Sequence, residues 1–136
     1  AERGGGAWLA DTKRLRVAGR RHLSDAVVST GIKTQGTSND TLQLRQLATI
    51  NPAVAGIRRS GSIAVDMAWM ASGRFDALWE AGLKPWDVAP GLLMVKEAGG
   101  LVTDFAGQPG SVWNGQIVAG NEMLHGALLK SLRTIQ

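Results

Sequence analysis

The stretch FDALWEAGLKPWDVAPGLLMVKEAGGLVTD, residues 75–104, predicts a strand, a helix and a second strand in succession. Its first five residues, all apolar except Asp76, are typical of a strand, and its last four predict another. Between them a helix opens at Trp86 and Asp87, and the unbroken apolar run at residues 92–95 indicates that more than one side of it is buried. The glycine pair at residues 99–100 ends this helix in the usual C-terminal manner.

The same alternation of strands and helices continues on both sides of this stretch. It predicts an α/β fold: a layered α/β/α domain with a mostly parallel, mixed sheet of about five strands. No domain boundary is visible, so we expect a single domain over residues 1–136. Further strands are predicted at residues 14–17, 26–30, 56–60 and 116–119, and further helices at residues 41–50, 63–72 and 121–133.

Composition excludes several classes of protein. The share of apolar residues, 44%, is normal for a globular protein and argues against disorder along the whole chain. The absence of cysteine excludes disulfide bonds and fits a reducing cytoplasm, so we expect a cytoplasmic protein. No apolar run approaches the roughly 20 residues that cross a bilayer, and no secretory signal is visible at the start of the chain, so we expect no membrane partner.

The chain carries a net charge of +4, and much of the excess lies between Lys13 and Arg21. Such a cluster can attract nucleic acid or an anionic substrate, but it is also typical of a solvated face. No aromatic residue interleaves these charges, which weakens the case for a surface that stacks on bases.

Three short segments, each at a strand end or a helix start, carry the candidate chemistry. Gly61 precedes a helix start, where the backbone amides of Ser62 and Ile63 can point outward as donors to a phosphate. Glu80 ends an apolar strand, where a carboxylate can accept strong hydrogen bonds from substrate hydroxyls. Asp87 stands where a helix begins, and its carboxylate is a hard oxygen ligand suited to Mg²⁺.

Each of these segments also has a purely structural interpretation. The turn at Gly61 can be an ordinary capped helix, Glu80 a solvated loop residue and Asp87 an N-cap that satisfies free amides. Other polar residues make weaker candidates. The histidines are far apart in the sequence and in polar surroundings, and Asp66 and Asp76 fall inside a predicted helix and strand, where a surface or structural role is more usual.

The segment WDVAPGLLMVKEAGG, residues 86–100, closely resembles the C-terminal signature of the inositol monophosphatase family. Residues 57–63 resemble the family's segment in which a glycine and the next two residues contact phosphate or inositol. Glu80 lies seven positions before Asp87, where the family places a substrate-binding glutamate. The resemblance covers essentially the whole chain. Residues 1–20, with ERGGGAW and RLRVAGR, resemble the junction of the family's two halves, and IVAGNEMLHGALL resembles its last strand and helix.

This resemblance implies a phosphomonoesterase in which Mg²⁺ ions bridge the substrate phosphate and a metal-bound water attacks phosphorus. Asp87 would be a metal ligand, and Glu80 would bind the hydroxyls of inositol, a sugar or a nucleotide. The amides after Gly61 would hold the substrate, with Ser62 and Ile63 as its contacts. The family also implies a homodimer for the full-length protein, and the N-terminal half of the same enzyme as a partner of this chain.

The chain departs from the family in lacking the upstream Glu-rich segment and the Asp-Pro-x-Asp-Gly-Thr motif. None of its seven Asp precedes Pro or Gly, so we expect no catalytic residue within this half and no hydrolysis by the isolated chain. Some bacterial relatives also act in transcription complexes. A non-catalytic role in binding RNA or a transcription complex is therefore an alternative, and a module that shares only the fold is a further one.

Overall fold

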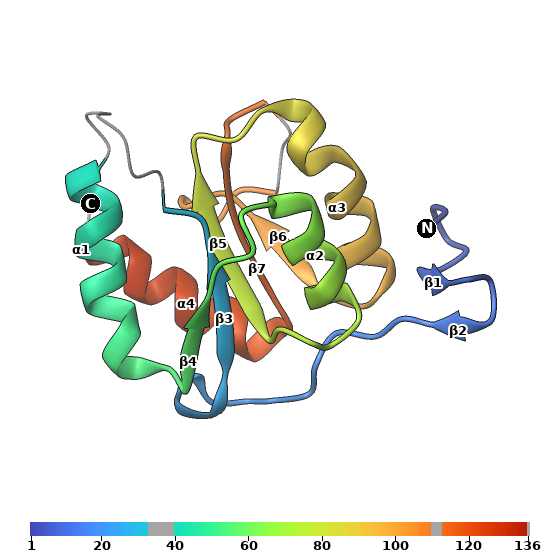
Figure 1. Cartoon of the computed structure of the whole chain (residues 1–136), viewed down its shortest axis with the longest axis horizontal. Helices are drawn as coiled ribbons and strands as arrows, with labels where there is room; N and C mark the ends of the chain where they lie inside the picture. The colour runs from blue at the N-terminus through green and yellow to red at the C-terminus, as the bar shows by residue number, and fades with distance from the viewer. Residues whose placement is uncertain (33–39, 110–112, 136) are drawn as a thin grey trace.

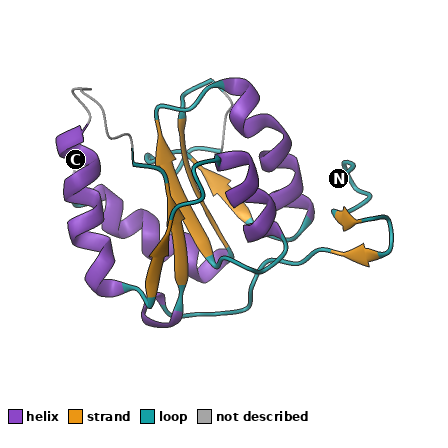
Figure 2. Cartoon of the chain, in the orientation of Figure 1, coloured by secondary structure: helices purple, strands orange, loops and turns teal. Residues whose placement is uncertain are grey.

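The computed structural model describes residues 1–32, 40–109 and 113–135, which form a five-stranded sheet between two layers of helices (Figures 1 and 2). The strand order is β4-β3-β5-β7-β6. The sheet strands are β3 (Val27–Thr30), β4 (Gly56–Arg58), β5 (Ala77–Ala81), β6 (Leu101–Thr103) and β7 (Gln116–Gly120). The helices are α1 (Asp40–Ile50), α2 (Ile63–Ala71), α3 (Pro85–Glu97) and α4 (Glu122–Arg133).

The predicted fold class is confirmed: the sheet has five strands and is mixed. Strand β3 pairs in parallel with both β4 and β5, whereas β7 pairs antiparallel with both β5 and β6. Four strands therefore run in one direction, and β7 runs in the other. None of the helices among the described residues is long and apolar enough to span a bilayer.

Alternate residues of β5 face the two helical layers, as expected for a central strand covered on both sides. Leu78 packs in one apolar cluster with α2 and α3, and Ala77 and Trp79 pack in the other with α4 and the end of α1. All three side chains are almost completely buried. The predicted strand at residues 75–79 therefore exists but lies two residues later in the chain.

Helices α2 and α3 pack closely where Gly91 of α3 faces Met67 of α2. A Cβ atom at position 91 would lie 2.7 Å from the Cβ of Met67, closer than two such atoms approach in real proteins. The absence of a side chain at Gly91 thus lets the two helix axes come close together. This contact matters for the site because α2 begins after the Gly61 turn and α3 begins beside Asp87.

The first residues include a small hairpin of β1 (Trp8–Leu9) and β2 (Lys13–Arg14), which stands to one side of α3 (Figure 1). The carboxylate of Glu97 accepts hydrogen bonds from the backbone amides of Gly4 and Gly6, at 2.8 and 3.0 Å. The prediction of a strand over residues 14–17 was wrong beyond its first residue. After β2 the chain leaves the hairpin and follows the body of the molecule, so the alternation of Arg with apolar residues marks a half-buried extended segment instead.

The start of β5 is closed by a buried carboxylate. Asp76 is 1% exposed, accepts a hydrogen bond from the backbone amide of Val27 at 2.7 Å and forms an ion pair with Arg20 at 3.0 Å. Asp76 therefore joins β5, β3 and the segment that follows the hairpin. Its role is structural, one of the two roles expected from the sequence.

Candidate functional site

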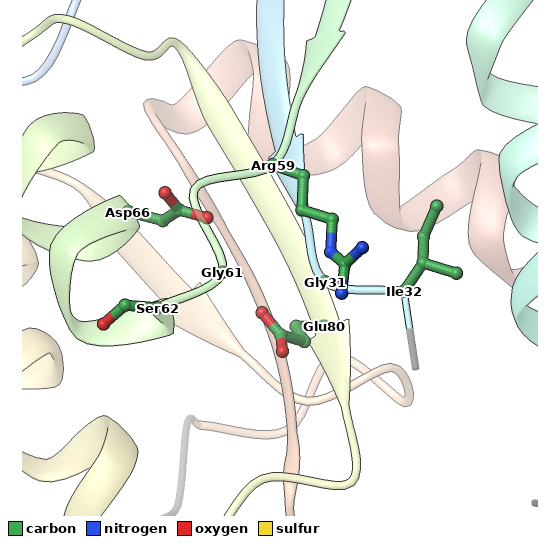
Figure 3. Close-up of a pocket in the computed structure, with 7 residues that line it drawn as sticks. All are labelled: Gly31, Ile32, Arg59, Gly61, Ser62, Asp66 and Glu80. Carbon is green, nitrogen blue, oxygen red and sulfur yellow. The ribbon is translucent and has the colours of Figure 1, made fainter. Parts of the chain in front are cut away.

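The opposite end of β5 opens on a cleft between the start of α2 and the start of α3. The structure brings together all the site residues predicted from the sequence, although they come from three separate segments of the chain. The residues that line this cleft include Gly61, Ser62, Ile63, Glu80 and Asp87. A second hollow adjoins the first and shares Gly61, Ser62 and Glu80 with it, and Figure 3 shows its lining.

The turn before α2 has the backbone shape that the Gly-Ser sequence predicts. Gly61 has a φ of +89°, which a residue with a side chain adopts only at a cost, and Ser62 has the extended conformation of an N-cap. The side chain of Ser62 accepts a hydrogen bond from the amide of Val65, so the helix start is capped as well as glycine-flanked.

Only part of the predicted donor set is available at this helix start. The backbone amide of Ser62 donates to Oγ of Ser60 at 3.1 Å, so it does not point freely into the cleft as expected. The amides of Ile63 and Ala64 donate to no acceptor among the described residues. Because the first turn of a helix leaves its amides without intrahelical acceptors, these two are the donors that remain for an anion.

Asp87 lies in the first turn of α3, three residues after the N-cap Lys84. Its Oδ2 atom accepts the backbone amide of Lys84 at 2.9 Å, and the other oxygen has no partner among the described residues. Asp87 therefore stabilises the helix start and also lines the cleft. The neighbouring Trp86 is 74% exposed and is not among the residues that line either hollow.

Glu80 lies near the end of β5 and is the one carboxylate shared by the two hollows. Its side chain is half-buried, and Figure 3 shows its carboxylate beside Gly31 at the end of β3. Arg59 comes from the end of the segment after β4 and reaches the same hollow. The Glu80 carboxylate, an acceptor, and the Arg59 guanidinium, a donor, thus line one hollow, together with Gly31, which directly follows β3.

The sequence interpretation missed Asp66, which also lines the second hollow. It is 2% exposed, and its Oδ2 atom accepts a short hydrogen bond from the hydroxyl of Ser29 on β3. Its Oδ1 atom is buried without a hydrogen-bond partner among the described residues. A signal was present, because Asp66 lies three residues after Ile63 and four before Met70, on the face of α2 that turns to the sheet.

His125 was expected in polar surroundings but is only 7% exposed. Its Nε2 atom lies 2.9 Å from the hydroxyl oxygen of Thr103, and burial lowers the pKa of its imidazole below the ordinary value. It packs beneath β6 and β7 on the face of the sheet covered by α4, outside the residues that line the cleft.

The described residues fit a magnesium ion only in part. No group of three Asp, Glu or His side chains among them comes close enough to hold a metal. Mg²⁺ requires near-octahedral coordination by hard oxygen atoms, and among the described residues only two carboxylates, those of Glu80 and Asp87, line the cleft. Any further protein ligands must come from outside the described residues.

The profile of the Inositol monophosphatase family matches residues 1–136. The chain belongs to this family. An Inositol-1-monophosphatase of Mesorhizobium japonicum is 47% identical over 97% of this chain, and the Nus factor SuhB of Pseudomonas aeruginosa is 44% identical over 98%. Each match spans 49% of the relative, so this member of the family covers about half the length of the curated relatives that it matches.

Solved structures agree with this assignment. The extragenic suppressor protein suhB from Bartonella henselae superimposes with a TM-score of 0.92 at 43% identity, over 98% of this chain and 51% of that one. The inositol monophosphatase from Anabaena gives a TM-score of 0.86 at 31% identity, over 98% of this chain and 53% of that one. The five-stranded sheet and its helices are therefore a recurring part of the inositol monophosphatase fold.

Proposed function

We propose that this chain is the C-terminal part of a Mg²⁺-dependent phosphomonoesterase that hydrolyses inositol monophosphate or a related sugar or nucleotide phosphate. The observation that carries the proposal is the convergence of Asp87, Glu80 and the α2 start on one cleft. It is supported by the family and by relatives named Inositol-1-monophosphatase. The chain forms one domain, residues 1–136, and works with the N-terminal half of the same enzyme, in a homodimer and in the cytoplasm.

Each residue of the cleft has a distinct task in this proposal. The free carboxylate oxygen of Asp87 holds the metal, while its other oxygen, bound to the Lys84 amide, fixes the orientation of the side chain. The amides of Ile63 and Ala64 bind an anionic oxygen of the phosphate, helped by the partial positive charge at a helix start. Glu80 accepts hydrogen bonds from substrate hydroxyls.

When bound, Mg²⁺ supplies the polarisation of phosphate oxygens and the lowered pKa of a bound water that phosphate ester hydrolysis requires. A single carboxylate does not retain this ion tightly, because it keeps most of its water and needs several hard ligands. The isolated chain therefore releases no phosphate from inositol 1-phosphate, and substantial release by the purified chain would contradict the division of the site between two halves.

Asp87→Asn in the full-length gene product is the decisive test. The amide keeps the size of the side chain but removes the charge that attracts the metal, so kcat/KM for inositol 1-phosphate should fall at least about 100-fold. The thermal unfolding midpoint should change little, since an amide oxygen can still accept the Lys84 amide. Asp25→Asn, in an exposed turn outside the cleft, is the matched control and should retain activity. Full activity in Asp87→Asn would refute the proposed site.

A second candidate function is RNA or transcription-complex binding. Relatives named Nus factor SuhB match over nearly the whole chain, and Arg16 and Arg21 are exposed on the segment that follows the hairpin. RNA binding through them should weaken steeply with salt, and Arg16→Gln with Arg21→Gln should reduce that slope. Arg20 is unsuitable for this test because its ion pair with Asp76 is part of the fold. Salt-independent binding, or none, would exclude this role.

A further inference from the structure

The carboxylate of Glu80 occupies a space that exists because residue 31 has no side chain. A Cβ atom at position 31 would lie 2.7 Å from Oε2 of Glu80 and closer still to Oε1 and Cδ. No real Cβ atom comes so close to another heavy atom. Figure 3 shows the Glu80 carboxylate beside the Gly31 backbone, where β3 ends.

The pairing of the two strands explains this contact. Strands β3 and β5 are parallel, and Thr30 is the partner of Trp79, so the next residue of each strand is Gly31 and Glu80. Neighbouring positions of a sheet lie about 4.8 Å apart and project side chains on the same face. A side chain at position 31 would therefore point into the volume that the Glu80 side chain fills.

Space is the reason for glycine at this position. The φ of Gly31 lies outside the left-handed region, so its backbone conformation is open to any residue. Gly61 in the same cleft differs, because its φ of +89° itself favours glycine. Gly31→Ala thus changes the position of the Glu80 carboxylate without imposing backbone strain.

We propose that Gly31 is a positioning residue for Glu80 and thereby sets the preference of the site for hydroxyl-bearing phosphomonoesters. Because position 31 has no side chain, the Glu80 carboxylate fits against the end of β3, at the border of the two hollows. A methyl group at position 31 drives the carboxylate into the space where substrate hydroxyls bind. This proposal rests on the proposed function, because it assigns a consequence to the Glu80 acceptor of the same site.

The first experiment compares Gly31→Ala with the unaltered full-length gene product on two substrates. KM for inositol 1-phosphate should rise about tenfold, the effect of losing one hydrogen bond to a charged group, whereas kcat should change less than about threefold. KM for phenyl phosphate, which has no hydroxyl groups on its ring, should stay unchanged. Gly126→Ala is the control, since a Cβ there meets no atom within 4 Å. Equal rises in KM for both substrates would overturn the proposal.

The second experiment is a double-mutant cycle that a merely structural role would not affect. Glu80→Asp shortens the side chain by one methylene and withdraws its carboxylate from Gly31. In the Gly31→Ala background this change should therefore cost less affinity for inositol 1-phosphate than in the unaltered protein, and strict additivity would contradict direct contact. Unfolding midpoints that match the unaltered protein would show that both variants fold.

The two proposals fail in different ways. If the unaltered protein hydrolyses neither substrate, the proposed function fails, and calorimetry with inositol 1-phosphate then tests Gly31 alone. Binding that Gly31→Ala weakens and Gly126→Ala leaves intact would support the positioning role. No binding of inositol 1-phosphate to the unaltered protein would overturn both.

Discussion

The two ends of strand β5 carry carboxylates that differ in burial and in what surrounds them. Asp76, just before the strand, is 1% exposed, and both its oxygens have partners in the backbone amide of Val27 and the guanidinium of Arg20. Glu80, four positions later, is half-buried, and its carboxylate borders two hollows. Strand β5 thus runs from a closed end, where the buried Asp76 bonds to its own chain, to an open end, where Glu80 borders the cleft.

The difference gives a criterion that distinguishes structural carboxylates from candidate ligands in this fold. A carboxylate whose hydrogen-bonding capacity is consumed by its own chain has little left for a ligand, and its removal leaves buried donors unpaired. Asp87 keeps one oxygen unpartnered among the described residues and lines the cleft, so it retains capacity for a ligand. Four substitutions test this contrast, beginning with the one of largest expected effect.

Asp76→Ala should destabilise the protein most, by about 3 kcal/mol. The change leaves the amide of Val27 without its acceptor inside the sheet and removes the partner of Arg20. Urea unfolding of the full-length gene product measures the free energy of unfolding. Any hydrolytic activity should persist in the folded fraction, because Asp76 does not line the cleft.

Arg20→Ala separates the two bonds of Asp76. The Arg20 side chain is 53% exposed, so its ion pair is screened by solvent and its loss should cost less than about 1 kcal/mol. A cost equal to that of Asp76→Ala would show that the closed end depends on the ion pair rather than on the backbone hydrogen bond.

The contrast also explains what the sequence could predict. Glu80 and Asp87 were chosen as candidate site residues because Glu80 ends a predicted strand and Asp87 opens a predicted helix. Local pattern reveals both positions, and a specific family signature reinforces them. The depth of Asp76 and Asp66 could not be predicted, because it depends on partners 49 and 37 residues away, Val27 and Ser29. The sheet order, with β7 reversed between β5 and β6, depends likewise on long-range packing that periodicity does not encode.

Gly91→Ala tests how the starts of α2 and α3 are held together at the open end. We expect it to lower the free energy of unfolding by about 1–2 kcal/mol. The added methyl would overlap Met67 and push α2 from α3, and this cost exceeds the gain in helix propensity. The same displacement separates the α2 start from Asp87, so KM should rise as well. Gly126→Ala, on an exposed position of α4 with no atom near its new Cβ, should instead stabilise the protein by up to about 1 kcal/mol. If both substitutions changed the free energy of unfolding in the same direction, the close packing of α2 against α3 would be contradicted.

Glu97 tests whether burial or hydrogen-bond partners give a carboxylate its structural role. It lies near the surface but accepts hydrogen bonds from two backbone amides. The amide of Gly4, and to a smaller extent that of Gly6, lowers the pKa of Glu97 below its ordinary value, although desolvation opposes them. A lowered pKa means that the folded state binds fewer protons than the unfolded state. The contribution of Glu97 to the free energy of unfolding is therefore complete above the ordinary carboxyl pKa, and it disappears as the pH falls through the lowered pKa.

Glu97→Gln should therefore accelerate amide hydrogen exchange of Gly4 and Gly6 a few-fold at neutral pH, because a neutral amide offers a single weaker acceptor. As the pH falls, the unaltered protein loses its charge at Glu97, so the two exchange rates, corrected for intrinsic chemistry, should converge. Glu122→Gln on α4 is the control and should leave both amides unaffected. If Glu97→Gln changes neither exchange rate, hydrogen bonds to a carboxylate near the surface do not stabilise the segment at residues 4–6. The stability of the closed end of β5 would then come from the burial of Asp76 itself.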